Sequence, residues 1–389
     1  MLRIYLLALI CASALRADTT LVLPFFNHSK SANLDWIGES IAETVHDALA
    51  SEGVLVLGRS DRLEAYRRLS MRPGAELTHA SILKLGDALD ASQVVYGSYE
   101  LLEASSPNAK GALRIEARIV DLKRTHQGPV FTETGALDDL AQLESHLGWQ
   151  ALTALRPKNA PSEQEFVKTR PPVRLDAVES YVRGLLATSA EQRHRFFTQA
   201  ARLDEHYSQP CFQLGRIYWE RKDYKVAGGW FQRVTRTDSH YFEAQFFLGL
   251  CRYYNGDFPG AEQAFQTVAA EVPLNEVFNN LGAAQDRRNN AGAASTNFEK
   301  ALEGDSADPD YHFNLGYALW RSGKYDAAAE SLRAAAARDP KDTEATTLLG
   351  RALRKDGPRP GDPKTEGRER LKTNYDEAAY RQLQAELAK

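Results

Sequence analysis

The spacing of apolar residues differs between the two halves of the chain. In the first half, short apolar runs bounded by turn residues predict strands at 21–26, 54–57, 93–102, 113–122 and 130–135. Apolar residues recur at helical spacing over 36–51, 60–69, 78–89 and 137–155. Strands first alternate with helices and then follow one another directly. We therefore predict an α/β domain over 18–155, a mixed sheet with helices packed on it.

In the second half, a Leu-Gly pair recurs at almost constant spacing. The pairs are Leu214-Gly215, Leu248-Gly249, Leu281-Gly282, Leu315-Gly316 and Leu349-Gly350, and subtracting successive glycine numbers gives 34, 33, 34 and 34. An alanine follows twelve positions after each of the first four glycines, and four positions further on stands Phe231, Phe265, Phe298 or Leu332. This period and pattern resemble the tetratricopeptide helix-turn-helix unit. The second half is therefore predicted to be an all-α tetratricopeptide solenoid.

Composition shifts set the boundaries of this array. A stretch rich in Pro, Lys and Glu over 156–174 is predicted to be an extended linker. The array is predicted over 175–357, about five units of which the first is degenerate. The remainder, 358–389, is predicted to be a linker followed by a C-terminal capping helix for the solenoid. The charged mixture over 364–372 is interpreted as a solvated helix face or linker.

A concave groove is expected where the first helices of stacked units line up. Positions three before, one after and four after each glycine should face it. Aromatic side chains give contact area and arginines hold carboxylates or carbonyl groups, which suits an extended peptide or a partner helix. The predicted peptide-binding residues are Phe212, Arg216, Trp219, Phe246, Tyr253, Phe313, Tyr317, Trp320 and Arg351. The alternative is that these side chains pack against the next helix in the core.

Two asparagines, Asn280 and Asn314, stand two positions before their glycines. Tetratricopeptide proteins that grip a C-terminal carboxylate place asparagines there, with lysines four positions earlier. Here the earlier positions are Glu276 and Asp310, which would repel an anionic chain end. We therefore predict that this clamp is absent and that the asparagines bond backbone or water.

The first domain resembles a known family in several short motifs. These are Val22-Leu23-Pro24-Phe25 with Asn27, the run 36–43 (Trp-Ile-Gly-Glu-Ser-Ile-Ala-Glu), Val94-Val95-Tyr96-Gly97-Ser98 and Ile119-Val120-Asp121. They are similar to the TolB N-terminal-like domain, related in fold to the CsgG and FlgO domains of the bacterial envelope. The resemblance implies a small α/β domain that docks to envelope partners. TolB itself continues into a β-propeller, which nothing here resembles, so its role in the Tol–Pal system does not transfer.

The first residues carry a localisation signal. Arg3 precedes an apolar run over 4–10 and small residues over 12–14, which predicts a signal peptide over 1–17 and a periplasmic protein. An uncleaved N-terminal anchor is the alternative. No other stretch approaches transmembrane length. Cys211 and Cys251 stand six positions apart in the repeat frame, so we expect two buried free thiols rather than a disulfide.

Catalytic patterns are missing from the sequence. The histidines are scattered, and there is neither a glycine-rich phosphate loop nor a nucleophile elbow. We expect no enzyme activity, no catalytic residues, no cofactor and no metal. The formal net charge of −4 also argues against nucleic-acid binding. The leading hypothesis is an exported scaffold that holds a protein or peptide partner of the envelope; the sequence leaves open whether it acts as a monomer or as a homo-oligomer. The alternative is a small-ligand sensor that signals through the array.

Overall fold

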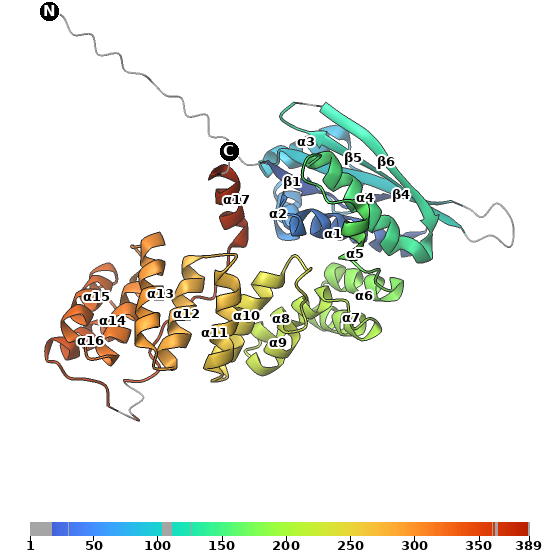
Figure 1. Cartoon of the computed structure of the whole chain (residues 1–389). Helices are drawn as coiled ribbons and strands as arrows, with labels where there is room; N and C mark the ends of the chain where they lie inside the picture. Colours follow the sequence, from blue (N-terminus) through green and yellow to red (C-terminus); the bar gives the residue numbers. More distant parts are fainter. Residues whose placement is uncertain are drawn as a thin grey trace, which may run out of the picture.

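The computed structural model describes residues 18–29, 31–102, 111–124, 126–359, 361 and 365–387. The predicted signal peptide lies outside these residues. The described part confirms the predicted fold class, since a mixed sheet with helices is followed by a helical array (Figure 1).

Strand pairing explains why the sheet is mixed. Its order is β3-β1-β4-β5-β6, with β2 also paired to β4. The early strands are joined by helices and pair in parallel, whereas β4, β5 and β6 follow one another and pair antiparallel. The strands are β1 (Thr19–Val22), β2 (Phe26–Asn27), β3 (Leu55–Val56), β4 (Gln93–Leu102), β5 (Ala112–Asp121) and β6 (His126–Ala136).

The run predicted as one strand over 21–26 forms two short strands, β1 and β2. Pro24 stands between them and has no N–H to donate to a strand ladder. The neighbouring Phe25 N–H instead donates to the Gly38 carbonyl at 3.0 Å. The strand therefore ends where helix α1 approaches it.

Helices cover both faces of the sheet because side chains alternate along its strands. Val22 and Val95 face α1 (Trp36–Ser51) and α4 (Leu140–Leu155), which share one core with them. Leu21 and Val94 face the other side, where α2 (Arg59–Arg68) and α3 (His79–Ala88) form a separate core. Short 3₁₀ helices, Ala32–Leu34 and Leu137–Asp139, precede α1 and α4.

The array consists of helix pairs with the predicted period. Its helices are α6 (Leu175–Leu186), α7 (Ala190–Leu203), α8 (Gln209–Glu220), α9 (Tyr224–Phe231), α10 (Tyr241–Tyr254), α11 (Phe258–Ala269), α12 (Asn275–Arg287), α13 (Ala291–Gly304), α14 (Pro309–Arg321), α15 (Tyr325–Arg338) and α16 (Thr343–Leu353). The repeated glycine permits the close crossing within each pair: a Cβ added at Gly249 would lie 2.6 Å from the Phe265 ring. Cys211 and Cys251 are buried free thiols, as predicted.

The linker prediction is wrong in part. Residues 163–168 form helix α5 (Glu163–Lys168) rather than extended chain. Ser162 begins it by accepting a hydrogen bond from the Glu165 N–H while Glu165 bonds back, a capping box. Phe166 is 1% exposed and anchors the helix in the core. One buried aromatic residue and a cap therefore outweigh the polar composition.

The predicted capping helix is also misplaced. Helix α17 (Glu377–Leu387) does not cover the end of the array at α16; it contacts β3 of the first domain and stands beside the middle of the array (Figure 1). The reason lies in the preceding residues, which run back along the array before the helix begins.

The first domain and the array are in direct contact. Helix α1 packs against α6. Ser239, from the loop before α10, donates a hydrogen bond to Asp47 of α1 at 2.8 Å. The position of the array is thus fixed against the helix layer of the sheet.

Candidate functional site: an occupied groove

The concave side of the array holds residues 365–376 of the same chain, here called the tail segment. These residues pass back over α14, α12 and α10 until α17 begins (Figure 1). Thr365, at its start, accepts a hydrogen bond on its carbonyl from the Tyr317 hydroxyl at 3.0 Å. The ring of Tyr375, near its end, lies 5.1 Å from the Phe246 ring. The tail segment therefore runs antiparallel to the order of the repeats.

Asparagine side chains hold the backbone of the tail segment. Asn314 accepts from the Arg370 N–H and donates to the Arg370 carbonyl, both at 2.8 Å. Asn280 makes the same pair of bonds with Lys372, again at 2.8 Å each. Asn279 donates to the Arg370 carbonyl at 2.8 Å and accepts from Asn314 at 2.7 Å. Because backbone groups are common to all residues, these contacts select an extended conformation rather than a side chain.

The two clamping asparagines, Asn280 and Asn314, occupy the same position of successive repeat units. The residues they hold are two apart, and side chains two apart point to the same face of an extended segment. One repeat unit therefore engages one two-residue step of the tail segment.

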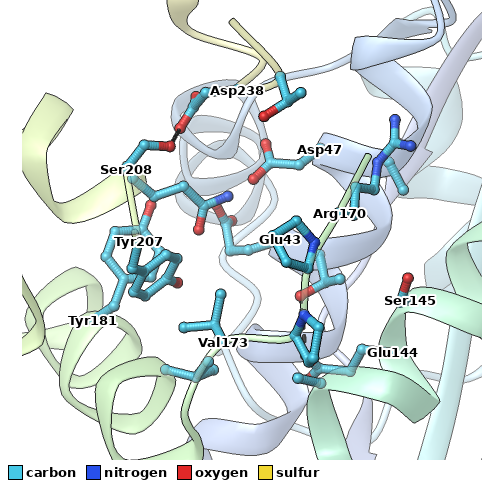
Figure 2. Close-up of a pocket in the computed structure, with 18 of the residues that line it drawn as sticks. Glu43, Asp47, Glu144, Ser145, Arg170, Val173, Tyr181, Tyr207, Ser208 and Asp238 are labelled. Carbon is cyan, nitrogen blue, oxygen red and sulfur yellow. Dashed lines mark hydrogen bonds between the residues drawn. The ribbon is translucent and has the colours of Figure 1, made fainter. Parts of the chain in front are cut away.

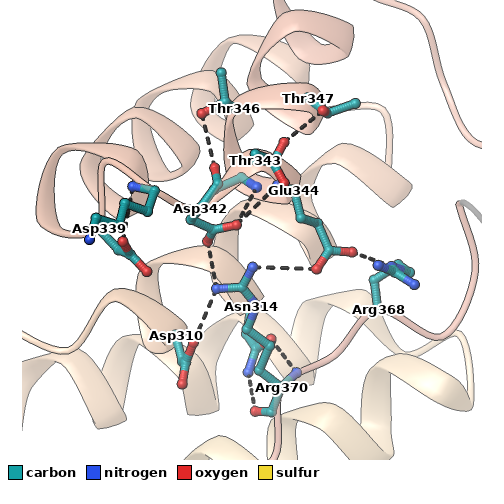
Figure 3. Close-up of polar contacts among 12 residues, drawn as sticks. Asp310, Asn314, Asp339, Asp342, Thr343, Glu344, Thr346, Thr347, Arg368 and Arg370 are labelled. Atoms are coloured by element: carbon teal, nitrogen blue, oxygen red, sulfur yellow. Dashed lines mark hydrogen bonds and ion pairs between the residues drawn. The ribbon is translucent and has the colours of Figure 1, made fainter.

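Carboxylates of the array receive the basic side chains on that face (Figure 3). The Arg370 guanidinium lies 2.7 Å from Asp342, 3.1 Å from Asp310 and 3.4 Å from Glu344. Its carbon lies 3.6 Å from the centre of the Phe313 ring, a cation–π contact.

The basic side chains on either side of Arg370 are bound in the same way. The Lys372 ammonium lies 2.7 Å from both Asp308 and Asp310. Arg368 pairs with Glu344. Basic residues at every second position, 368, 370 and 372, thus meet one acidic surface.

The acidic surface is placed by the helix starts of the array. Asp308 and Asp342 are the N-cap residues of α14 and α16, and their side chains bond first-turn N–H groups. Asp310 and Glu344 follow two positions later, in the first turns. The four residues form two equivalent pairs, one in each of two successive repeat units.

The electrostatics of this surface favour the ionised forms. Burial alone would raise the pKa of Asp310, but Lys372 and Arg370 outweigh it and hold that pKa below its usual value. The pKa of Asp342 is lowered in the same way by Arg370, against the effect of burial. The charges of the tail segment and of the array therefore stabilise each other.

The other face of the tail segment meets a second set of groups. The Glu369 side chain is fully buried; it accepts a hydrogen bond from Tyr253 at 3.0 Å and lies 3.6 Å from Arg321. Burial, and then the neighbouring carboxylate of Asp286, raise the pKa of Glu369 to about 7. Leu371 packs on the apolar core.

Of the nine predicted groove residues, four contact the tail segment and Trp320 contacts the chain ahead of it. Phe246, Tyr253, Phe313 and Tyr317 contact the tail segment as described above. Trp320 donates from its indole nitrogen to the Asp356 carbonyl, at 2.8 Å, just after α16.

The remaining four predicted residues pack elsewhere in the array and contact no residue of the tail segment among the described residues. Phe212 stacks on His240, with ring centres 4.4 Å apart, and Trp219 packs on Phe247 at 5.2 Å. Arg216 pairs with Glu243 at 3.3 Å. Arg351 is partly buried, and its Nη1 has no hydrogen-bond partner in the described part of the chain.

The sequence interpretation did not identify the tail segment as the occupant of the groove, nor the acidic residues that bind its basic side chains. Asn280 and Asn314 are predicted from the sequence to bond backbone or water, and they bond backbone. The acidic residues Glu276 and Asp310 would repel an anionic ligand. For the same reason they attract a basic one, and Asp310 does bind Arg370 and Lys372. Glu276 accepts a hydrogen bond from Asn374 at 2.8 Å. The interpretation of 364–372 as a solvated face or linker is wrong for residues 365 and 368–372, which the groove holds, whereas Glu366 and Gly367 are exposed.

A cavity of about 420 Å³ lies between the first domain and the array (Figure 2). Its wall includes carboxylates from both parts, with Glu43 and Asp47 on α1, Glu144 on α4 and Asp238 before α10. Glu144 is 1% exposed, and its Oε1 has no hydrogen-bond partner within ordinary bonding geometry among the described residues.

The protonation of Glu144 follows from its position in that wall. Burial raises its pKa to about 7, although the hydroxyls of Ser40 and of Thr44, which lies 3.0 Å from the other carboxylate oxygen, act in the opposite direction. Apolar and aromatic side chains such as Val173, Tyr181 and Tyr207 complete the wall (Figure 2).

Two further properties concern the described residues only. Their His, Cys, Asp and Glu side chains form no group of three arranged to hold a metal ion. None of their helices combines the length and the apolar character needed to cross a membrane.

Comparison with known proteins supports the class of the second half. Residues 212–276, 279–343 and 316–358 match the family model of the tetratricopeptide repeat. The chain therefore contains a tetratricopeptide repeat array, a curved solenoid of the kind that presents an extended concave binding surface. No curated protein matches the chain.

Similar solved structures include MamA and YrrB proteins. A MamA fragment from Desulfovibrio magneticus RS-1 is 23% identical, covers 41% of this chain and 92% of its own, and has a TM-score of 0.37. A MamA RS-1 double mutant is 24% identical with the same coverage and TM-score. YrrB, described as a TPR protein with an unusual peptide-binding site, is 17% identical, covers 51% and 93%, and has a TM-score of 0.36.

Proposed function

We propose that this protein is an interaction scaffold whose repeat groove binds an extended peptide segment of a partner protein. The observation that carries the proposal is the pairing of Asn280 and Asn314 with both backbone groups of a residue in an extended chain. These contacts form with any sequence that reaches the groove in that conformation. The groove therefore has the chemistry of a peptide-binding site, and the tail segment is the ligand that it now holds.

A displayed library of random twelve-residue peptides tests this proposal. The bait is the full chain with Arg370→Glu and Lys372→Glu, which weakens its own tail segment. Peptides should be enriched on this bait and lost when Asn280→Ala and Asn314→Ala are added. The matched control is Asn297→Ala, since Asn297 is a buried asparagine of α13 that bonds Gln285 instead. If no enriched peptide depends on the two clamping asparagines, the proposal fails.

The place of action is part of this proposal. The signal-peptide pattern over 1–17 and the resemblance of 18–155 to TolB N-terminal-like domains support a periplasmic scaffold whose first domain docks to an envelope component. Cell fractionation with a C-terminal tag tests it. Recovery of the intact chain in the cytoplasm would contradict it.

A second candidate function is a small-ligand sensor, favoured by the cavity between the first domain and the array. The buried, unpartnered Glu144 oxygen and the surrounding aromatic wall suit a protonated amine with an apolar body. Thermal-shift measurements with such amines should show stabilisation of the wild type that Glu144→Gln abolishes. Equal shifts for both proteins would refute this function.

A further inference from the structure

We infer that the groove is specific for extended segments with basic residues at alternate positions, and that the tail segment is an internal occupant which such a partner displaces. This inference rests on the proposed function, because it names the ligand class and the regulation of the same groove. It draws on three observations about the tail segment.

The first observation is the repeated acidic arrangement. Asp308 and Asp310 recur in the next repeat unit as Asp342 and Glu344, each pair at a helix start facing the groove. Together they bind Arg368, Arg370 and Lys372, which occupy alternate positions. Successive repeat units engage ligand residues that are two positions apart. A ligand therefore places a basic side chain against each of the two acidic pairs only if its basic residues stand at alternate positions.

The second observation is that residues 369 and 371, which lie between the basic residues, meet a different set of side chains. Glu369, between two basic residues, faces Tyr253, Arg287 and Arg321 on the opposite wall. Leu371 meets apolar side chains. An incoming segment should therefore carry an acidic or polar residue and then an apolar residue between its basic ones.

The third observation concerns how the tail segment is held. Its contacts are mostly backbone hydrogen bonds and ion pairs, with Leu371 and Tyr375 as its partly buried apolar residues. The helix pairs of the array pack against one another along its whole length without it. Proline- and glycine-bearing residues precede it, and α17, which follows it, leaves Leu383 and Leu387 exposed. These features are those of an exchangeable ligand, and not of a core element.

Fluorescence anisotropy with a labelled peptide of sequence 365–376 tests the inference on full-length protein. The chain with Arg370→Glu and Lys372→Glu should bind the peptide at least tenfold more tightly than the wild type, because its own tail segment no longer competes. Adding Asp310→Lys to that chain should abolish binding. A peptide carrying the same two glutamates should not bind either protein, and high salt should weaken the complex.

Several outcomes would overturn the inference. One is equal affinity of the two chains for the peptide, and another is equal binding of the charge-reversed peptide. A wild-type dimer in light scattering that dissociates on Arg370→Glu and Lys372→Glu would identify a second copy as the occupant instead. Circular dichroism of each variant checks that the helices remain.

The peptide library separates this inference from the proposed function. Enriched peptides that need the asparagines but lack alternating basic residues would leave the peptide-binding function in place and refute the specificity. The absence of any asparagine-dependent peptide would refute the function itself.

Discussion

Replacing Asn314 by alanine tests how the tail segment is held. The substitution removes both bonds to Arg370, at 2.8 Å each, while leaving Asn279 to donate to the Arg370 carbonyl. A hydrogen bond contributes about 1 kcal/mol net, and a partly buried N–H left without a partner costs somewhat more. We therefore expect the docking free energy of the tail segment to fall by about 2–3 kcal/mol, which is a factor of about 30 to 150 in the docking equilibrium.

Amide hydrogen exchange resolved by residue measures this change. In the wild type, the amides of Arg370 and Lys372 are bonded to Asn314 and Asn280 and should be protected. In Asn314→Ala both should exchange about 30 to 150 times faster, because the tail segment opens as a unit. Amides in the middle of α11 should be unaffected. The control Asn297→Ala should leave residues 370 and 372 as slow as in the wild type.

One result would refute this reasoning. If the amides of Arg370 and Lys372 keep wild-type exchange rates in Asn314→Ala while the helices remain folded, the asparagine does not hold the backbone. The tail segment would then be retained by its charged side chains, and the proposed backbone-reading groove would lose its support.

Three further predictions concern the rest of the molecule. Gly97→Ala should destabilise the first domain by about 3 kcal/mol in chemical denaturation, since the new Cβ would lie 2.1 Å from the Glu116 carbonyl oxygen. The control Gly229→Ala should be neutral or stabilising, because the space at that position is open. The wild type should lose up to about 3 kcal/mol of stability as pH rises from about 4.5 to about 7, because burial raises the folded-state pKa of Glu144 and favours its protonated form in the folded protein. Glu144→Gln should remove this loss, and identical pH profiles of the two proteins would contradict the prediction. Cys211 and Cys251 should resist a thiol reagent until unfolding, as mapped by mass spectrometry, since burial raises their pKa values to about 11 and about 12.

The parts of the fold that sequence predicts well are those where burial is periodic. The Leu-Gly spacing predicts every helix pair from α8 to α15, because each pair must bury the same positions against its neighbour. Apolar runs predict the sheet for the same reason. The exception is the split at Pro24, where the missing N–H rather than hydropathy decides.

The tail segment shows where such prediction ends. Its residues are mostly polar and its few apolar residues have no period, so it resembles a linker. Its ordering depends on groups far away in sequence. Asn314 lies 56 residues from Arg370, and Asn280 lies 92 from Lys372. The acidic residues that match the basic ones are present at the helix starts. However, Asp308 and Asp342 are N-caps and Asp310 and Glu344 lie in first turns, where acidic residues are common, so local helix structure already explains them.

The course of the tail segment also bears on how the array unfolds. In a solenoid each repeat contacts only its neighbours, so end repeats fray and the array melts in stages. Here the tail segment bonds Glu344 on α16, Asn314 on α14 and Asn280 on α12, and it contacts Phe246 on α10. Fraying at the α16 end then breaks contacts that the tail segment makes across the repeats from α10 to α16. A docked tail should make the array melt in a single cooperative step, and its release should return the repeats to melting one after another.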